Sequence, residues 1–366
     1  MNRHIRFTLG VLLFGLAVCS AQAAFSSLYI FGDGVSTTTN NTSGLTTYYY
    51  GKRFSNGRVW VEVLAQRQGL GANSITNVNW SYSTNNCSYL YDLSSDLVKN
   101  VGNFNAPTNA TNALFIVWVN DADFVNDVIN DATNTTLWTN DMNLSLTNHF
   151  NAITNLYAKG ARTLIMPNAV DLSKVPDYQN YAAATNGFIR QRIIDFNAAF
   201  TTTLMNRLRT NCPGITIYVP DFFALLDNML TNAAAYGLTN AGIDALDDLS
   251  LTNLSMTGPG ANYIWWDGQD PTAKAHEIMA DVVQQLISPV QITNLTLLDD
   301  ENQLDVANMP IGLNGFVDGT TNLAPVNWVT QANFNSTNAT QAVFVPASDS
   351  QQMFYRLRFP FAWSWP

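Results

Sequence analysis

Charged side chains are scarce in this sequence, and positive ones are the scarcest. Lys, Arg, Asp and Glu together make up 12% of the 366 residues, about half of the usual share of about 25%. The net charge is −10. Removal of the first 23 residues, which include Arg3 and Arg6, would leave 15 basic against 27 acidic residues and a net charge of −12. A chain this acidic is disfavoured as a partner of nucleic acid or of an anionic membrane.

Histidine and cysteine are nearly absent. The chain has three histidines and three cysteines, and only two of each follow residue 23. His149 and His276 both fall inside predicted helices, where we expect them to be surface or packing residues. Cys87 and Cys212 would be permitted to form a disulfide in an oxidising compartment. Two separate thiols are equally compatible with the sequence.

Long apolar runs are missing after the N-terminus. The one such run, residues 7–18, follows Arg3 and Arg6 and precedes Ala21-Gln22-Ala23. Basic start, apolar run and small-residue cleavage site are typical of a secretory signal peptide, and the run is too short to span a membrane. We therefore expect residues 1–23 to be a signal peptide and the mature chain to be secreted, periplasmic or bound to the cell surface.

Strands alternate with helices over most of the mature chain. Short apolar runs predict strands at 28–31, 74–80, 113–118, 163–166 and 215–219, and helical spacing predicts helices at 57–68, 89–101, 140–159, 188–208 and 271–286. Asn56 is the candidate cap of the helix at 57–68, and Asp221 could cap a further helix. This alternation predicts a parallel sheet with helices on both sides, in a domain covering residues 25–288.

The pattern changes at Ser288-Pro289. Short alternating stretches at 290–297, 326–331, 342–346 and 353–359 are separated by loops rich in Asn, Asp and Gly. They predict a small all-β module at 289–366, with a sandwich-like arrangement. Its ending, Phe354-Tyr355-Arg356-Leu357-Arg358, resembles terminal β modules of secreted bacterial proteins.

Two motifs near the start carry a family resemblance. Phe31-Gly32-Asp33-Gly34 follows a predicted buried strand, and residues 50–60 read YGKRFSNGRVW. Both resemble the GDSL (SGNH) esterase/lipase family, the second its plant-type members. The resemblance extends over roughly residues 25–287 and implies a three-layer α/β/α fold. It also implies a catalytic serine, histidine and aspartate, with backbone and asparagine donors for the oxyanion.

Several of these catalytic positions are changed. Gly34 stands where the family has its nucleophilic serine, and a glycine has no side chain to attack an ester. Ser36 lies two residues further on, which displaces it by several ångströms, and it suits a turn or helix cap. At the backbone oxyanion position the family's glycine is replaced by Ser83 or Thr84.

The third and fifth motifs depart as well. The third motif corresponds to Trp118-Val119-Asn120-Asp121-Ala122-Asp123-Phe124. A match without gaps places Ala122 at the oxyanion-binding asparagine, whereas a gapped match would keep Asn120. Both aromatic anchors favour the ungapped match. In Trp266-Asp267-Gly268-Gln269-Asp270-Pro271-Thr272, Asp267 keeps the triad acid and Asp270 replaces the histidine. Asp270 before Pro271 is also the pattern of a helix N-cap, the role that we expect for it.

Joint loss of serine and histidine within a preserved scaffold predicts a pseudoenzyme that binds a carbohydrate or an acyl ester without hydrolysing it. The alternative is an active esterase with an unusual nucleophile. The resemblance would bring Asp33, Asp123, Asp267 and Asp270 to one cleft. Carboxylates without a basic neighbour repel one another unless a proton or a cation intervenes. A Ca²⁺ or Mg²⁺ site and a glycosidase-like acid/base pair are therefore further hypotheses, beside an open solvated cleft.

Overall fold

The computed structural model describes residues 25–38, 48–51, 53–70, 94–348, 350 and 352–359. The predicted signal peptide, the predicted strand at 74–80, Ser83, Thr84 and Cys87 lie outside these residues. Cys212 is buried. Within the described part of the chain, no helix has both the length and the apolar character needed to cross a membrane.

A parallel four-stranded sheet forms the centre of the larger domain. Its strands β1 (Leu28–Gly32), β2 (Leu114–Trp118), β3 (Thr163–Ile165) and β4 (Thr216–Tyr218) pair in sequence order. All five residues of β2 are buried, as a continuous apolar run predicts for a strand covered on both faces. The three-layer α/β prediction is confirmed.

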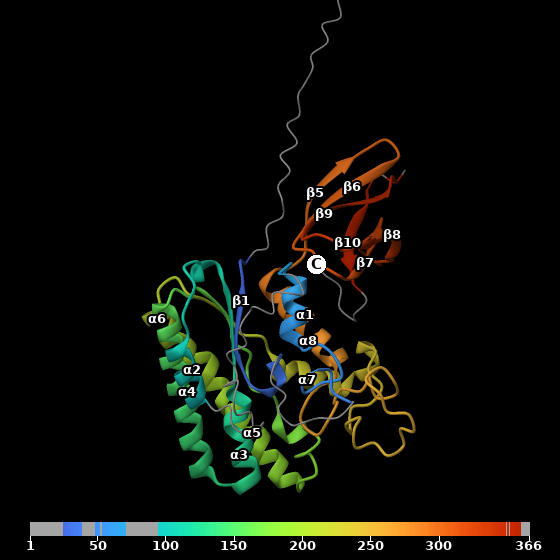
Figure 1. The fold of residues 1–366 in the computed structure, drawn as a ribbon. Helices are drawn as coiled ribbons and strands as arrows, with labels where there is room; N and C mark the ends of the chain where they lie inside the picture. The colour runs from blue at the N-terminus through green and yellow to red at the C-terminus, as the bar shows by residue number, and fades with distance from the viewer. Residues whose placement is uncertain are drawn as a thin grey trace, which may run out of the picture.

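Helices flank this sheet (Figure 1). Helix α1 (Trp60–Arg67) packs against α8 (Ala273–Ile287), and α2 (Ser94–Asn103) packs against α4 (Thr135–Ala158). The remaining helices of eight or more residues are α3 (Asn120–Asp131), α5 (Ala183–Ala199) and α7 (Phe222–Thr231). Asp221 caps α7, since its carboxylate accepts a hydrogen bond from Ala224 N. That predicted cap is confirmed.

The predicted helix at 188–208 is interrupted. After α5 the backbone forms a π-helical turn, Phe200–Leu204, before it continues as α6 (Met205–Asn211). Two threonine hydroxyls bond back to carbonyls four residues earlier: Thr201 Oγ1 donates to Asn197 O and Thr202 Oγ1 to Ala198 O. Such back-bonding loosens the regular helical ladder.

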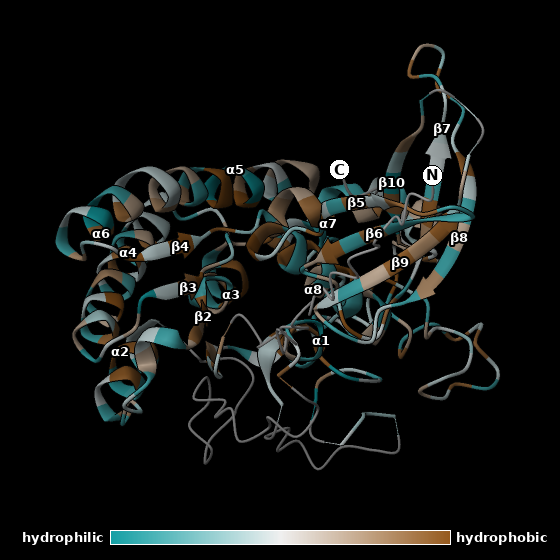
Figure 2. Cartoon of the chain, turned by 90° about the horizontal axis from the view of Figure 1, so that it is seen from above, coloured by the Kyte–Doolittle hydropathy of each residue, from teal (hydrophilic) through white to brown (hydrophobic). Residues whose placement is uncertain are grey.

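The C-terminal module consists of two antiparallel sheets. One has the order β5-β6-β9 and the other β10-β7-β8, as seen from above in Figure 2. Their bounds are β5 (Gln291–Leu297), β6 (Glu301–Ala307), β7 (Asn314–Thr320), β8 (Val329–Asn335), β9 (Thr340–Pro346) and β10 (Phe354–Arg358). The all-β prediction is confirmed, although β6 and β7 were not anticipated.

A buried ion pair lies where the module meets the larger domain. Arg67 at the end of α1 pairs with Asp281 of α8 at 2.7 Å, and Arg67 Nη1 donates to Ile311 O at 3.2 Å. One guanidinium thus links both helices to the loop before β7.

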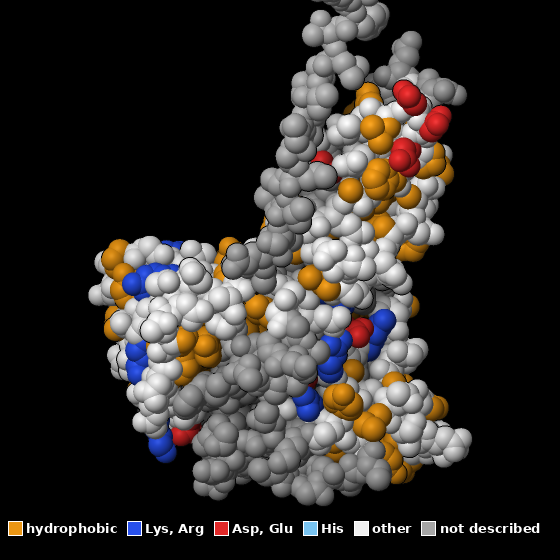
Figure 3. Space-filling view, turned by 45° about the horizontal axis from the view of Figure 1, so that its top comes forward, with side chains coloured by type: hydrophobic (Ala, Val, Ile, Leu, Met, Phe, Trp, Pro, Cys, Tyr) orange, Lys and Arg blue, Asp and Glu red, His pale blue; other side chains and the backbone are white. Residues whose placement is uncertain are grey.

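The surface itself carries few charges. In Figure 3, acidic side chains gather at the far end of the module and basic ones lie over the larger domain.

Candidate functional site

A cavity of about 310 Å³ opens where β1 and β2 end. This is the edge of a parallel sheet at which ligands bind in open α/β folds. Its volume is at the lower end of the range for small-molecule sites. We call the acidic and aromatic residues of its lining the floor: Asp33, Tyr49, Phe54, Trp118, Asp121, Asp177, Tyr178, Trp265, Asp267 and Asp270. We call the aliphatic residues of its lining the walls: Val125, Val170, Leu172, Val175, Leu225, Leu226, Met229, Ile264 and Met279.

Asp33 fixes the turn that follows β1. Its backbone N donates to Trp118 O at 3.1 Å, and its Oδ1 accepts from Val35 N at 3.2 Å. The side chain is buried. Burial raises the pKa of Asp33 to about 7, and the nearby charge of Asp123 adds to the rise.

Gly34 lies next to the Asp270 carboxyl at the cavity. A Cβ placed on Gly34 would lie 3.6 Å from Phe54 Cδ2 and 3.8 Å from Asp270 Oδ1. Both are ordinary van der Waals distances, so the position has room for a side chain. The two positions at which the resemblance implies serine and histidine therefore lie within reach of each other.

Asp267 and Asp270 form a linked pair of carboxyls. Asp267 Oδ1 accepts from Asp270 N at 2.8 Å and from Gln269 N at 3.0 Å, while Tyr49 Oη donates to Asp267 Oδ2 at 2.7 Å. Burial raises the pKa of both carboxyls, and the charges of Asp267 and Asp33 raise that of Asp270 further. The pair therefore retains a proton to a higher pH than exposed carboxyls would.

Asp270 is not a helix cap, which corrects the prediction. Thr272 caps α8, with its Oγ1 accepting from Ala275 N at 3.2 Å. The backbone before it is held extended, because Trp266 N donates to Asp270 O and Thr272 N donates to Ile264 O. The helix consequently begins two residues later than expected, and the Asp270 carboxyl remains at the cavity.

The Ser55-Asn56-Gly57 motif holds this segment in place. Ser55 Oγ donates to Pro271 O at 2.9 Å, and Asn56 Oδ1 accepts from Ala273 N at 2.7 Å. A Cβ on Gly57 would come within 2.5 Å of Ala273 Cβ, so this close approach requires glycine. Asn56 was expected to cap the helix at 57–68. It instead serves the start of α8, and Val59 occupies the cap position of α1.

Ser36 does not reach the cavity. It is buried, and its Oγ accepts a hydrogen bond from Trp60 Nε1 at 3.1 Å. It is absent from the cavity lining. The structure therefore gives Ser36 a packing role and offers no support for a surrogate nucleophile.

The start of α3 decides which acids reach the cavity. Asp121 and Ala122 line it, whereas Asp123 turns away and accepts from Ser94 N at 2.7 Å. The expectation that Asp123 joins the cleft is thus wrong, and Asp121 takes that place. Residues two apart on a helix lie on different faces, and the helical start at Asn120 was not foreseen. Asp121 Oδ1 accepts from Val170 N, and burial raises its pKa well above the usual value.

Asn120 is directed away from the cavity as well. Its amide Nδ2 donates to Pro167 O at 3.1 Å, and the side chain is buried. Ala122, in the ungapped match, is the residue that lines the cavity. This segment therefore presents the methyl group of Ala122 to the cavity, and the side-chain donor of Asn120 lies elsewhere. Thr84, the other predicted oxyanion position, lies outside the described residues.

Neither described histidine supplies a base. His276 Nδ1 accepts from Trp60 N at 3.2 Å, and burial lowers its pKa to about 3. His149 lies in α4, and burial lowers its pKa to about 4. Both histidines are buried packing residues. Packing was one of the two roles predicted for them, and burial excludes the other, a surface location.

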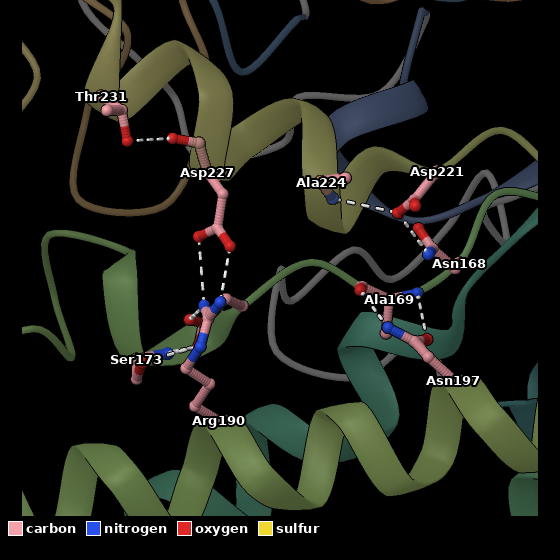
Figure 4. Close-up of polar contacts among 10 residues, drawn as sticks. Asn168, Ala169, Ser173, Arg190, Asn197, Asp221, Ala224, Asp227 and Thr231 are labelled. Carbon is pink, nitrogen blue, oxygen red and sulfur yellow. Dashed lines mark hydrogen bonds and ion pairs between the residues drawn. The ribbon is translucent and has the colours of Figure 1, made fainter.

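Arg190 links two segments that carry lining residues of the cavity, and Figure 4 shows its contacts. From α5 it pairs with the fully buried Asp171 and with Asp227 of α7, the latter at 2.5 Å. Asp171 adjoins the wall residues Val170 and Leu172, and α7 carries Leu226 and Met229. Hydrogen bonds from Asn168 to Asp221 and between Asn197 and Ala169 tie the same segments together.

Metal binding has no geometric support here. Among the residues that the structure describes, no group of three or more His, Cys, Asp or Glu side chains is arranged to hold a metal ion. The Ca²⁺ or Mg²⁺ site stays a prediction, and a calorimetric titration with calcium would test it.

Comparison with known proteins identifies the scaffold. The sequence model of the family described as GDSL-like lipase/acylhydrolase matches residues 28–283, well over half of the chain. The chain belongs to this GDSL family. Three similar proteins from Arabidopsis thaliana, each named as a GDSL esterase/lipase, have 23%, 25% and 24% identity to it. The alignments cover 73%, 71% and 69% of this chain and 90%, 88% and 80% of the respective relatives.

Within this GDSL scaffold, Gly34, Ala122 and Asp270 line one cavity, but the sequence motifs do not predict much of what surrounds them. Tyr49 and Asp177 carry no motif of their own. Asp177 reaches the site because its N donates to Gly268 O and its Oδ2 accepts from Gln269 Nε2. The aliphatic walls come from the 170–175 loop and α7, and only the placement of those segments could reveal them.

Proposed function

We propose that this GDSL-family chain is an exported protein that binds an acyl ester, or another small ligand with an apolar chain, without hydrolysing it. One observation carries the proposal. At the edge of the sheet where the family's chemistry would take place, Gly34 offers no nucleophile, and the side chain opposite it is the carboxyl of Asp270.

The absence of a base reinforces the absence of a nucleophile. A carboxylate is a far weaker base than an imidazole toward a serine hydroxyl. Ala122 adds a third deficit, because one missing oxyanion donor costs about 3–4 kcal/mol of transition-state stabilisation. The described residues that line the cavity include no serine and no histidine.

The cavity itself supports retained binding. Aliphatic walls around a few polar groups are the usual composition of a small-molecule site. The walls suit an acyl chain better than a carbohydrate, because a sugar would leave its hydroxyls unpaired against Val, Leu, Ile and Met side chains.

Hydrolysis of p-nitrophenyl butanoate tests the proposal. We expect the natural chain to be silent and a Gly34→Ser/Asp270→His variant to turn over slowly. Addition of Ala122→Asn should raise that rate by about 10²–10³-fold, the usual contribution of an oxyanion donor. The matched control is Gly34→Ser alone, which should remain silent.

An active natural chain would contradict the proposal. Labelling by a fluorophosphonate would then identify the serine responsible, with Ser36→Ala as the first variant to examine. Export is tested separately by sequencing the N-terminus of the protein recovered outside the cytoplasm. A mature chain that begins at Ala24 is the expected result.

A further inference from the structure

The ionisable side chains that line the cavity, in the described part of the chain, are all acidic. Five carboxyls line it, from Asp33, Asp121, Asp177, Asp267 and Asp270, and the described lining contains no Lys, Arg or His. Asp33 and Asp121 are also almost fully buried. A site built in this way disfavours an anionic ligand, because its charge would be desolvated beside like charges.

Aromatic rings surround the same acids. Tyr49, Phe54, Trp118, Tyr178 and Trp265 all line the cavity. Their ring faces carry partial negative charge, and a cation within about 6 Å of a ring centroid is stabilised by about 0.5–2 kcal/mol. Quaternary ammonium groups are recognised by such combinations of rings and carboxylates.

Some polar groups at the site are left without partners. Tyr178 Oη and Trp265 Nε1 are buried and have no hydrogen-bond partner within the described structure. Both residues line the cavity. Buried polar atoms are normally paired, so two residues of the lining carry hydrogen-bond donors that the described protein leaves unused.

We infer that the cavity selects amphiphiles that carry a cationic ammonium group, with the ammonium over the acidic and aromatic floor and the apolar chain against the aliphatic walls. This inference rests on the proposed ligand-binding function and adds the charge class of the ligand. It assigns to Asp270 a binding role in the place of a catalytic base. It also gives a physical reason why unpaired acids are tolerated there, since a bound cation offsets their mutual repulsion.

The sharpest test compares two ligands that differ only in charge. Butyrylcholine carries a trimethylammonium group, and 3,3-dimethylbutyl butanoate has the same shape with carbon in place of nitrogen. Binding of each to the full mature chain is measured by isothermal titration calorimetry. We expect butyrylcholine to bind at least tenfold more tightly.

Variants locate the source of the difference. Asp270→Asn and, separately, Asp121→Asn should each weaken butyrylcholine binding about five- to tenfold and leave the neutral ester unchanged. The control is Asp299→Asn, which removes the same charge at an exposed position of the C-terminal module and should change neither ligand. A melting curve of each variant shows that it is folded.

The outcomes separate the two claims. Equal or tighter binding of the neutral ester would overturn the ammonium inference and leave the proposed ester-binding function standing. Binding of neither ligand would overturn both. Equal loss of both ligands in Asp270→Asn would also overturn the inference, because it would indicate a change of cavity shape and not of charge.

Discussion

Asp270 Oδ1 lies 3.8 Å from the point that a Cβ on Gly34 would occupy. Among the described residues other than its chain neighbours, the nearest to that point is Phe54, whose Cδ2 lies at 3.6 Å. The two positions at which the family resemblance implies a nucleophile and its base therefore lie side by side in the fold.

Gly34→Ala should be tolerated and Gly268→Ala should not. Gly34 has no positive φ, so alanine can stabilise the fold by about 0.4–1 kcal/mol through the unfolded chain. A Cβ on Gly268 would lie 2.0 Å from Asp177 Oδ1, and such overlap costs about 1–3 kcal/mol. Urea denaturation of both variants measures the contrast. Equal stabilities would show that the loop around Asp177 yields freely.

Stability should fall as the pH rises from 6 to 8. Burial raises the folded-state pKa of Asp33 to about 7 and those of Asp123 and Asp281 to about 6. A raised pKa means that the folded state holds protons that the unfolded state releases, so the stabilisation is complete below about pH 4 and is lost as the pH passes the folded pKa. Asp33 alone contributes about 1.4 kcal/mol of this loss between pH 6 and 8.

The two buried histidines act in the opposite sense. Their folded-state pKa values are lowered to about 4 and 3, so their contribution is lost as the pH falls below about 6.5. The raised acids are more numerous, and the melting temperature should still decline above pH 6. Asp33→Asn should flatten the profile. An unchanged slope in that variant would assign the titration to other groups.

Arg190→Met should destabilise the protein by about 2–3 kcal/mol, because it leaves the fully buried Asp171 carboxylate without its partner. The control is Arg192→Met, whose pair with Asp195 is partly exposed and should matter by less than about 1 kcal/mol. Denaturant unfolding gives both values. Loss of ligand affinity in Arg190→Met beyond the loss of folded protein would show that the cavity walls depend on this contact.

Thr272→Ala should cost about 1 kcal/mol through loss of the α8 cap. Asp270→Ala should cost little or even stabilise the fold, since it removes a buried acid that repels Asp267 and Asp33. Thermal melts at pH 7.5 distinguish the two. A larger loss in Asp270→Ala than in Thr272→Ala would restore the capping role to Asp270.

Local patterns predicted the parts of the fold that depend on local chemistry. The apolar run at 113–118 became β2, and Asp221 capped α7 as its position indicates. Motif spacing placed Gly34, Asp267 and Asp270 at one site because the family resemblance supplied the long-range contacts. Where two local explanations competed, as for Asp270 before Pro271, only the extended pairing of the preceding backbone decided between them.

The remaining elements depended on tertiary contacts. The alternation of apolar and polar residues in β6 is broken in the sequence, because the polar Asn302 occupies an inward position. There its Nδ2 donates to Tyr355 Oη at 3.0 Å. β7 contains Gly315, Gly319 and a buried Asp318 that two arginines neutralise. Asp121 lines the cavity and Asp123 does not, because the helix begins at Asn120. None of these features has a signal in the neighbouring sequence.

The turn after β1 is held without any side chain at residue 34, whose carbonyl accepts a hydrogen bond from Thr37 N at 3.0 Å. Asp33 bonds to Val35 N, Thr37 Oγ1 bonds to Asp33 O, and Ser36 is held by Trp60. The segment around Asp270 is likewise anchored by Ser55 and Asn56. The fold of this turn and the chemistry of residue 34 are therefore independent. Under the proposed function, a lineage that exchanged glycine and serine at this position would keep the turn in either direction.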